Sequence, residues 1–471
     1  MRKILRKFPK LLLIYVIYLF IAGILIFLKD FKADTYLPQD TYKSYLKETE
    51  GVDRAAIIED REFALTTRFR LLDEAQDSVK ILNYGIYKGE VSELFYGKIL
   101  QAANRGVDVK IVFDGFVNNL KGPINKTKWA LVNHPNIEIR FYEKLNLLRP
   151  WAFHNRLHDK IWLIDETFIL SGGRNIDDRF YLAAEQLFEP IVFDRDFLIY
   201  NSSQNSSKSV ISDFQNYFEE IWQHDYTAKA KPTLLKNLGK DRNEELIAYV
   251  EQVESDDNVS WTAPIDWAKI TSPTNKVSLV TNPIQRYKKT PIVLETLSQF
   301  FDEAEHTIIA QSPYFVLNEE LEQYINNEEL TADFHLLTNS YSSSPNILAM
   351  LGTHKYQKEI KELSSQIYTY EAEGSIHAKS YVIDDRISMV GSFNLDPRSA
   401  FLSAENLIII DSPELNQSLT EHIVTLMEQS SIHLNEESLS SNNVKPKEIP
   451  RHQKLIYSFL YILAYPYDEL L

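Results

Sequence analysis

The sequence predicts an α/β protein made of two similar halves that follow one transmembrane helix. Three observations predict this fold class: an unbroken apolar run near the N-terminus, an alternation of strand-like and helix-like patterns that occurs twice, and a motif that returns 219 residues further along the chain. The length of 471 residues leaves room for two to four domains at roughly 100–200 residues each.

The N-terminal segment has the features of a membrane-spanning helix. Residues 1–10 carry five Lys or Arg side chains, and residues 11–28 contain no charge. At 1.5 Å per residue this run reaches about 27 Å, close to the hydrocarbon thickness of a bilayer. The cations before the run favour a single-pass membrane protein with a cytoplasmic N-terminus and an extracytoplasmic body. A cleaved signal peptide is the competing interpretation.

The body alternates between strand and helix patterns. Residues 79–87 are expected to form a strand, residues 91–104 an amphipathic helix and residues 107–113 the next strand, which implies a parallel pair with a right-handed crossover. The same order is expected again as a helix at 295–304, a strand at 307–311, a helix at 317–325 and a strand at 334–338. We therefore predict a tether at 29–55, a first half at 56–228, a charged linker at 229–275, a second half at 276–430, a polar linker at 431–453 and an apolar tail at 454–471.

The apolar tail has two interpretations. From residue 455 onward, aliphatic and aromatic side chains are too dense for an exposed terminus, yet the run is too short to span a bilayer and is broken by Pro466. It is either a helix docked on the protein's own core or an interfacial helix with Tyr side chains at headgroup depth.

Composition excludes several classes of function. Fifty Lys and Arg against 66 Asp and Glu give a net charge of -16, of which the first ten residues contribute +5. Such an acidic body repels phosphate backbones, so no nucleic-acid partner is expected. The chain has no Cys, which excludes thiol nucleophiles, disulfides and Cys-ligated metal centres.

The repeated motif starts at His158 (HDKIWLIDETFILSGGRNIDDRF) and again at His377 (HAKSYVIDDRISMVGSFNLDPRS). Each copy has matching residues at the same distances from its His: Lys160 and Lys379, Asp165 and Asp384, Gly172 and Gly391, Asn175 and Asn394, Asp177 and Asp396, Arg179 and Arg398. A Glu follows each copy at nearly the same distance, Glu185 in the first and Glu405 in the second. So many shared positions are not accidental, and they indicate an internal duplication.

Each copy suits a strand, a tight turn and a returning strand. Period-two alternation places the His and the Lys on one face, and Asp165 and Asp384 suit the hairpin turns. The returning strands, expected at 168–171 and 387–390, bring Gly and Asn beside the starting His, where Gly leaves space for a ligand. Two His, two Lys and two Asn that converge form an oxyanion site suited to a phosphoryl group. Zinc is a weaker alternative, because the neighbouring Lys side chains would repel the cation.

The chain resembles the phospholipase D superfamily, whose mark is the paired His-x-Lys-x4-Asp motif. The resemblance covers residues 56–425. Within them, the segments at 172–179, 311–315 (QSPYF) and 391–406 are similar to the bacterial cardiolipin synthase branch, in particular its third enzyme type. The end of the chain also resembles that branch's short hydrophobic tail. The single N-terminal helix is a departure, since the better-known synthases carry two spans and the third type none.

The resemblance implies a fold and a catalytic role for each histidine. The expected fold has two α/β/α sandwich halves related by a pseudo-twofold axis, with both His residues at the junction. By the family's usual allocation, His158 attacks the phosphodiester and His377 acts as acid and then base. Glu185 and Glu405 are each expected to bond the Nδ1 of a His and fix its tautomer.

The resemblance also implies the remaining site residues. Phosphate oxygens are expected to be held by Lys160, Lys379, Asn175 and Asn394, in a substrate site that also includes Gly172, Gly391 and Ser392. The motif carboxylates Asp165 and Asp384 are expected to brace turns. Arg174 and Arg179 either read lipid headgroups or lie solvated at the surface. No metal or other cofactor is expected.

Three activities fit these residues. The first is a membrane phosphatidyltransferase that makes cardiolipin by transfer to phosphatidylglycerol, with either phosphatidylglycerol or phosphatidylethanolamine as the phosphatidyl donor. The second is a phospholipase D that hydrolyses phospholipids to phosphatidic acid, and it differs only in whether water is the acceptor. The third, a membrane-tethered nuclease, is disfavoured by the acidic body, because no basic stretch with interleaved aromatics lies near either motif. A non-catalytic scaffold would have to keep two complete motifs unused.

Overall fold

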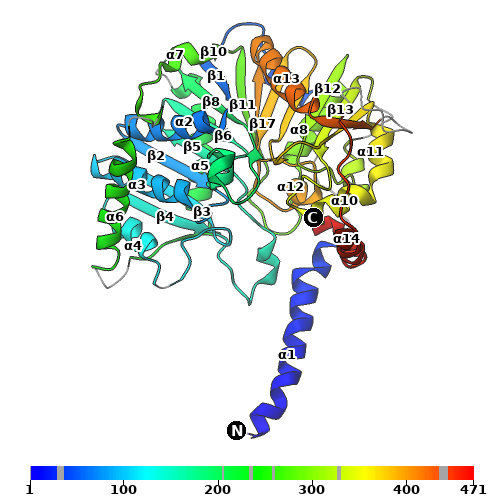
Figure 1. Cartoon of the computed structure of the whole chain (residues 1–471), viewed down its shortest axis with the longest axis horizontal. Helices are drawn as coiled ribbons and strands as arrows, with labels where there is room; N and C mark the ends of the chain where they lie inside the picture. The colour runs from blue at the N-terminus through cyan, green and yellow to red at the C-terminus, as the bar shows by residue number, and fades with distance from the viewer. Residues whose placement is uncertain are drawn as a thin grey trace.

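Two large β-sheets with the same strand order form the body of the protein (Figure 1). The structure is a computed structural model that describes residues 2–28, 37–122, 124–203, 206–232, 237–256, 260–325, 330–433 and 444–470. The first sheet runs β10-β1-β8-β6-β5-β2-β3-β4-β9 and the second β11-β18-β17-β16-β12-β13-β14-β19. Apart from β10, every strand of the first sheet has a counterpart in the second, so the predicted duplication is confirmed at the level of topology.

The first sheet consists of β1 (Asp53–Ile58), β2 (Ser78–Asn83), β3 (Asp108–Asp114), β4 (Ile137–Tyr142), β5 (Lys160–Ile164), β6 (Phe168–Gly172), β8 (Asp196–Asn201), β9 (Thr227–Lys229) and β10 (Ser272–Pro273). The second consists of β11 (Lys276–Thr281), β12 (Thr307–Gln311), β13 (Asp333–Asn339), β14 (Gln366–Tyr370), β16 (Ser380–Ile383), β17 (Ile387–Gly391), β18 (Asn406–Asp411) and β19 (Ser430–His433). In each sheet three consecutive strands are parallel, β2-β3-β4 and β12-β13-β14. The other strand pairs of these two sheets are antiparallel, and among them β5–β6 and β16–β17 are the hairpins of the two motif copies.

Helices cover both faces of each sheet. The outer face of the first sheet packs against α2 (Arg61–Glu74), α3 (Glu90–Asn104), α4 (Lys126–Val132) and α6 (Lys240–Glu254). The outer core of the second half includes α8 (Ile292–Asp302), α9 (Glu319–Glu322), α11 (Gln357–Leu363) and α12 (Pro397–Phe401). Between the sheets, α5 (Ile211–Gln223) and α13 (Pro413–Met427) share one core with strands of both halves. The expected pair of α/β/α sandwiches is therefore confirmed.

The expected elements form for the reasons that the sequence indicates. The apolar residues of the central strands β2 and β12 are buried because helices cover both faces of the sheets: Val79, Ile81 and Leu82 in β2, and Ile308, Ile309 and Ala310 in β12. Helix α3 ends at Asn104, and Gly106 follows with φ 103°, a left-handed conformation that glycine adopts without strain. The helix expected at 317–325 is reduced to the single turn of α9.

Two of the predicted connections contain packed structure. In the linker 229–275, α6 packs against α3 so closely that a Cβ at Gly97 would lie 2.4 Å from the Val250 side chain. In the tether, η2 (Thr41–Tyr45) packs on α8, and the Leu37 amide donates to the Glu295 carboxylate at 2.5 Å. Residues 29–36 of the tether and 434–443 of the polar linker lie outside the described residues.

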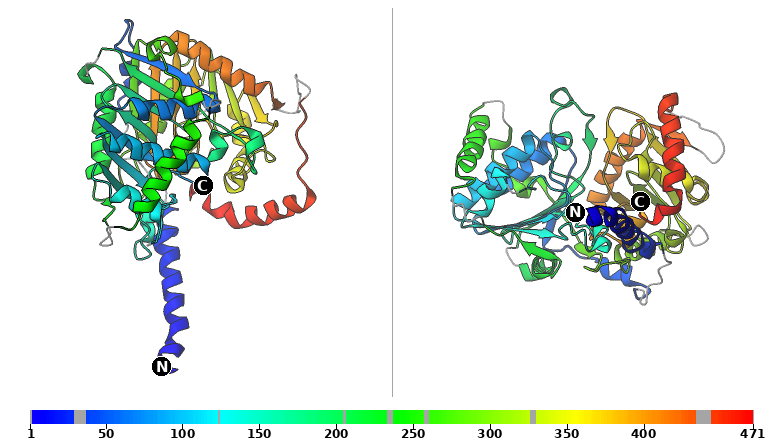
Figure 2. Two further views of the ribbon diagram at one scale, coloured as in Figure 1. Left: turned by 60° about the vertical axis from the view of Figure 1, so that its left-hand side comes forward. Right: turned by 90° about the horizontal axis from the view of Figure 1, so that it is seen from below.

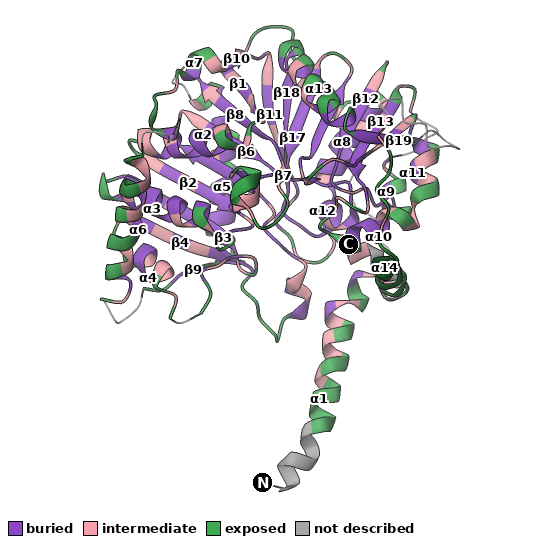
Figure 3. Cartoon of the chain, viewed as in Figure 1, coloured by how far each residue is buried: buried purple, intermediate pink, exposed green. Residues whose placement is uncertain are grey.

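Both ends of the chain lie on the same side of the body (Figures 1 and 2). Helix α1 (Arg2–Gly23) projects away from it, and most of its described side chains are exposed (Figure 3). Beside its base lies α14 (Arg451–Ala464), roughly perpendicular to α1 in the left view of Figure 2. One face of α14 stacks Tyr457 on Tyr341, with ring centroids 6.1 Å apart, while Leu455, Phe459 and Ile462 are exposed.

The last residues of the chain are docked on the second half. In η8 (Tyr465–Leu470), the Glu469 carboxylate accepts a hydrogen bond from Lys288 at 2.7 Å, and the Leu470 carbonyl accepts one from Arg398 at 3.0 Å. The tail is therefore docked on the protein while α14 exposes apolar side chains, and the interfacial interpretation stays a prediction.

Candidate active site

The two copies of the motif meet where the halves join. The backbone amide of His158 donates to the Ala404 carbonyl at 2.9 Å, and the amide of His377 donates to the Phe193 carbonyl at 2.7 Å. Each histidine is thus held by a segment of the opposite half. The short strands β7 (Val192–Phe193) and β15 (Ser375–Ile376) reinforce this junction as a parallel pair.

Each histidine bonds a carboxylate of the other half. His158 Nδ1 lies 2.9 Å from Glu405 Oε2, and His377 Nδ1 lies 2.6 Å from Asp194 Oδ2. A carboxylate at Nδ1 fixes the proton on that nitrogen and leaves Nε2 as the reactive atom. Glu405 therefore occupies the position expected of it, and it does so across the junction.

The expectation for Glu185 is wrong. Glu185 lies exposed in η5 (Ala184–Gln186), and the carboxylate at His377 is Asp194. The amide of the residue after Gly172 donates to Arg195, and the amide of the residue after Gly391 donates to Asn406, so Asp194 is the structural counterpart of Glu405. Asp194 follows its histidine by 36 residues and Glu405 by 28. The first half has a connection eight residues longer, which brought Glu185 to a matching distance by coincidence. Each partner lies one or two residues before the strand that follows the hairpin, β8 in the first half and β18 in the second. That shared position could have identified Asp194 from the sequence.

Both motif lysines are buried beside the histidines. Lys160 donates to the His158 carbonyl and Lys379 to the His377 carbonyl. Burial lowers the pKa of Lys160 to about 7 and that of Lys379 to about 8. Burial and the neighbouring ammonium of Lys379 lower the pKa of His377 to about 4, and burial with both lysines holds the pKa of His158 well below its usual range. These shifts favour the neutral form of both imidazoles.

The two histidine partners have different electrostatics. Burial raises the pKa of Glu405 to about 8, although Lys160 opposes the shift. Burial also favours the neutral form of Asp194, but its contacts with His377 and Lys379 outweigh that effect and lower the pKa of Asp194. The contacts of Asp194 thus favour its ionised form, whereas burial disfavours the ionised form of Glu405, which accepts a hydrogen bond from the Ser392 hydroxyl at 2.5 Å.

Aromatic rings and amides complete the site. The Tyr84 ring lies 4.7 Å from the His158 ring, and the Phe180 ring lies 5.3 Å from the His377 ring. A cavity of about 180 Å³ opens beside His377, and its lining includes Asn175 and Tyr314. Asn394 donates to the Tyr314 hydroxyl at 3.2 Å. The motif residues thus come together as expected, and Tyr84 and Tyr314 add to them.

Gly172 and Gly391 allow neighbouring segments of each sheet to pack closely. A Cβ on Gly172 would lie 2.1 Å from the Arg195 carbonyl oxygen, and one on Gly391 would lie 2.2 Å from that of Asn406. Those atoms belong to the chain that leads into the adjacent strands β8 and β18. Strand packing therefore already requires glycine at both positions, and the expected space for a ligand stays a prediction.

The motif aspartates brace turns, as expected. Asp165 and Asp384 have φ of 52° and 46° in the two hairpin turns. Each carboxylate accepts hydrogen bonds from three successive backbone amides, at 76–78 and at 305–307 respectively. For Asp384 these bonds outweigh burial and lower its pKa. Both residues lie at the far ends of β5 and β16 from the histidines.

Neither motif arginine of the first half is a free headgroup-binding group. Arg174 is 1% exposed and donates to Asp196 at 2.8 Å, beneath the site, so the alternatives of headgroup binding and solvation are both wrong for it. Arg179 lines the cavity but pairs with Asp177 at 2.7 Å and Glu189 at 3.0 Å.

Arg195, next to Asp194, is buried and donates to Gln311 and Ser380 of the other half, both at 2.7 Å.

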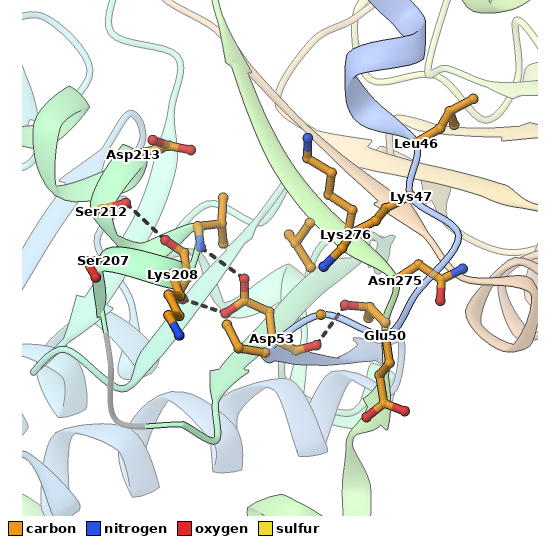
Figure 4. A pocket seen from close by; sticks show the side chains of 16 residues that line it. Leu46, Lys47, Glu50, Asp53, Ser207, Lys208, Ser212, Asp213, Asn275 and Lys276 are labelled. Carbon is orange, nitrogen blue, oxygen red and sulfur yellow. Dashed lines mark hydrogen bonds between the residues drawn. The ribbon is translucent and has the colours of Figure 1, made fainter.

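A larger cavity, of about 580 Å³, lies elsewhere (Figure 4). None of its lining residues belongs to the repeated motif, and its central carboxylate, Asp53, is committed to Ser209 Oγ at 2.5 Å and the Val210 amide at 2.9 Å. Among the described residues there is no group of three or more His, Cys, Asp or Glu arranged to hold a metal ion.

Comparison with known proteins agrees with this site. The family described as "Cardiolipin synthase, PLD-like domain" matches residues 69–222 and 297–427, more than half of the chain. The chain belongs to this family. It is 25% identical over 404 residues to cardiolipin synthase C of Escherichia coli K12, covering 77% of this chain and 82% of that protein. It is 24% identical over 424 residues to an uncharacterized protein of Helicobacter pylori 26695, covering 81% of each.

A solved structure shares the fold. Phosphatidylserine synthase of Haemophilus influenzae Rd KW20 superposes with a TM-score of 0.63 at 16% identity, covering 92% of this chain and all of that one. The resemblance to the phospholipase D superfamily and its cardiolipin synthase branch is confirmed, and the chain is an enzyme of that superfamily.

Proposed function

We propose that the protein is a cardiolipin synthase that transfers a phosphatidyl group through a phosphohistidine to phosphatidylglycerol. The observation that carries the proposal is the crossed arrangement, in which each motif histidine bonds a carboxylate of the other half. Two histidines at one junction, each with a carboxylate at Nδ1, supply one nucleophile and one proton donor, which is what a two-step phosphoryl transfer requires.

The reaction has two balanced steps. His158 Nε2 attacks the phosphorus of the donor, the bond from phosphorus to the headgroup oxygen breaks, and His377 gives that oxygen a proton. A hydroxyl of phosphatidylglycerol then attacks the phosphohistidine, returns a proton to His377 and releases His158. With phosphatidylglycerol as donor, two molecules give cardiolipin and glycerol. With phosphatidylethanolamine as donor, ethanolamine leaves instead.

The carboxylates support this allocation of roles. A general acid must carry a proton before the leaving group departs, and an ionised partner stabilises that imidazolium. The low pKa of Asp194 provides such a partner for His377. Burial raises the pKa of Glu405, so its support for a charged imidazole at His158 is weaker. The ammonium groups of Lys160 and Lys379 would balance the charge on the non-bridging oxygens.

Transfer and hydrolysis are separated by one assay. Purified protein in phosphatidylglycerol vesicles should form cardiolipin and glycerol in equal amounts. Phosphatidic acid as the main product would instead favour a phospholipase D. Adding phosphatidylethanolamine with a labelled headgroup tests that donor, through release of labelled ethanolamine.

The proposal includes attachment to the membrane by α1. Among the described residues, Pro9–Phe27 is the segment long and apolar enough to span a bilayer, and its exposed Leu11, Ile14 and Ile17 suit a lipid-facing helix better than a core helix. The basic residues before it favour a cytoplasmic N-terminus and an extracytoplasmic body. Protease protection of a C-terminal epitope in sealed inverted vesicles should follow from this orientation.

A further inference from the structure

The base of α1 is built into the body. Phe27, four residues beyond the end of the helix, is 1% exposed and packs its ring against His154 at 4.7 Å. The Gly23 carbonyl accepts a hydrogen bond from the His154 ring at 2.7 Å, and a Cβ on Gly23 would lie 3.2 Å from Pro150. The body therefore begins directly at the end of the apolar span, with no intervening spacer.

A loop of the body continues down the side of the helix. The Tyr15 hydroxyl donates to the Leu147 carbonyl at 2.8 Å, and the Tyr18 hydroxyl donates to the Leu148 carbonyl at 2.7 Å. Tyr18 precedes Gly23 by five residues and Tyr15 by eight, which at 1.5 Å per residue is about 8 and 12 Å along the helix. If α1 crosses the bilayer, the loop at 144–149 must enter the same leaflet.

The side chains of the loop suit that position. Leu145, Leu147 and Leu148 are 52%, 57% and 73% exposed, and the loop is flanked by the exposed cations Lys144 and Arg149. Exposure of three leucines within four residues to water is unfavourable, whereas their transfer to hydrocarbon lowers the free energy. Cations at the two ends of a short insert can reach lipid phosphates.

Several backbone polar groups of the loop also have hydrogen-bond partners within the protein. Irregular backbone is costly in lipid unless its polar groups have partners. Besides the two tyrosine bonds, the Leu148 amide donates to the Asn146 side chain at 2.9 Å, and the Arg149 amide donates to the Asn146 carbonyl at 2.8 Å. Much of the tip is thus satisfied without water.

We infer that the loop at 144–149 inserts into the outer leaflet beside α1, with its three leucines in the hydrocarbon and its flanking cations at the headgroups. The inference rests on the membrane span proposed above. It has a consequence for catalysis, because the chain runs from this loop through η3 (Pro150–Phe153) to His158 within nine residues of Arg149. A lipid headgroup would therefore meet the catalytic junction at the surface of the membrane.

Site-specific labelling tests the inference in the full-length protein. Because the natural chain has no Cys, Leu148→Cys, Ile17→Cys and Val424→Cys each carry one environment-sensitive bimane probe. Position 17 reports the span, and Val424, 40% exposed on α13 at the opposite side of the body, sets the aqueous baseline (Figure 1). The probes are read in phosphatidylglycerol vesicles with and without acyl-chain spin-labelled lipid.

The outcomes separate the two proposals. We expect blue-shifted emission and strong quenching at positions 17 and 148 alone. Quenching at 17 with an aqueous signal at 148 would overturn the inserted loop and leave the membrane span intact. Aqueous signals at both would overturn the span and the loop together. Replacing the three leucines by Ser should lower turnover of vesicle-borne substrate about tenfold or more, because the loop loses the apolar area that holds it in the bilayer, while turnover of a soluble short-chain phosphodiester should be unchanged. Equal losses on both substrates would contradict a membrane role.

Discussion

At the scale of single residues, the histidines depend on carboxylates that reach them from the opposite half. The pairing of His377 with Asp194 fixes the tautomer through a bond of 2.6 Å, so an amide in place of the acid would present the wrong hydrogen-bonding pattern to Nδ1. We expect Asp194→Asn to lower kcat about 10–100-fold. Glu185→Gln is the matched control and should leave kcat near the wild-type value. A large loss in the control with a mild effect of Asp194→Asn would return the role to Glu185.

The roles of the two histidines can be separated by the leaving group. A nitrophenolate departs without a proton, so a nitrophenyl phosphodiester does not require the general acid. His377→Ala should therefore still show a burst of nitrophenolate and an acid-labile, base-stable phosphoryl label on His158. His158→Ala should show neither. A burst in His158→Ala that is missing in His377→Ala would reverse the allocation.

The lowered pKa values of the two lysines predict that kcat/KM falls as the pH rises above neutral. An ammonium is charged below its pKa, and the pKa values of Lys160 and Lys379 are lowered from 10.5 to about 7 and about 8. The positive charge on the phosphate site is therefore lost as pH rises through this range, and kcat/KM should fall there. Lys379→Arg keeps its charge at higher pH and should move part of the fall upward. A profile that stays flat up to pH 10 would contradict these shifts.

At the scale of elements, the packing of β17 against β18 sets the position of Glu405. A Cβ at Gly391 would force the backbone at Asn406 outward, and Glu405 is the preceding residue. We expect Gly391→Ala to destabilise the fold by about 1–3 kcal/mol and to lower kcat. The control is Gly122→Ala, where φ is 91° and no atom crowds the new Cβ. It should cost stability through its backbone conformation and keep kcat. Melting temperatures and kcat of both variants check this.

At the scale of the whole molecule, α1 and α14 lie on the same side of the body, which the proposed membrane span would place against the bilayer (Figure 1). The exposed Phe459 and Ile462 would give α14 its own affinity for lipid. In protein lacking residues 1–22, which retains the buried Phe27, replacing both side chains by Ser should weaken vesicle flotation roughly 10- to 100-fold. The exposed Gln453→Ser on the same helix is the control. Unchanged flotation in the double variant would leave α14 as a docked tail without affinity for lipid.

The sequence by itself determined the local chemistry and the duplication. Several features could be predicted because they depend on near neighbours in the chain. These are the apolar residues of β2 and β12, the turns at Asp165 and Asp384, and the placement of His and Lys on one face of a strand. Period-two alternation and backbone sterics act within a few residues, and the family resemblance rested on the same segments.

Only the tertiary structure decided which residues meet across the halves. Asp194 reaches His377 from 183 positions away, and a connection of unequal length conceals it from any comparison by distance along the chain. The burial of Arg174 and the crowding at Gly391 likewise depend on strands that sequence order does not make adjacent. Such contacts arise when two sheets pack around a shared core, because burial and charge pairing act through space and not along the chain.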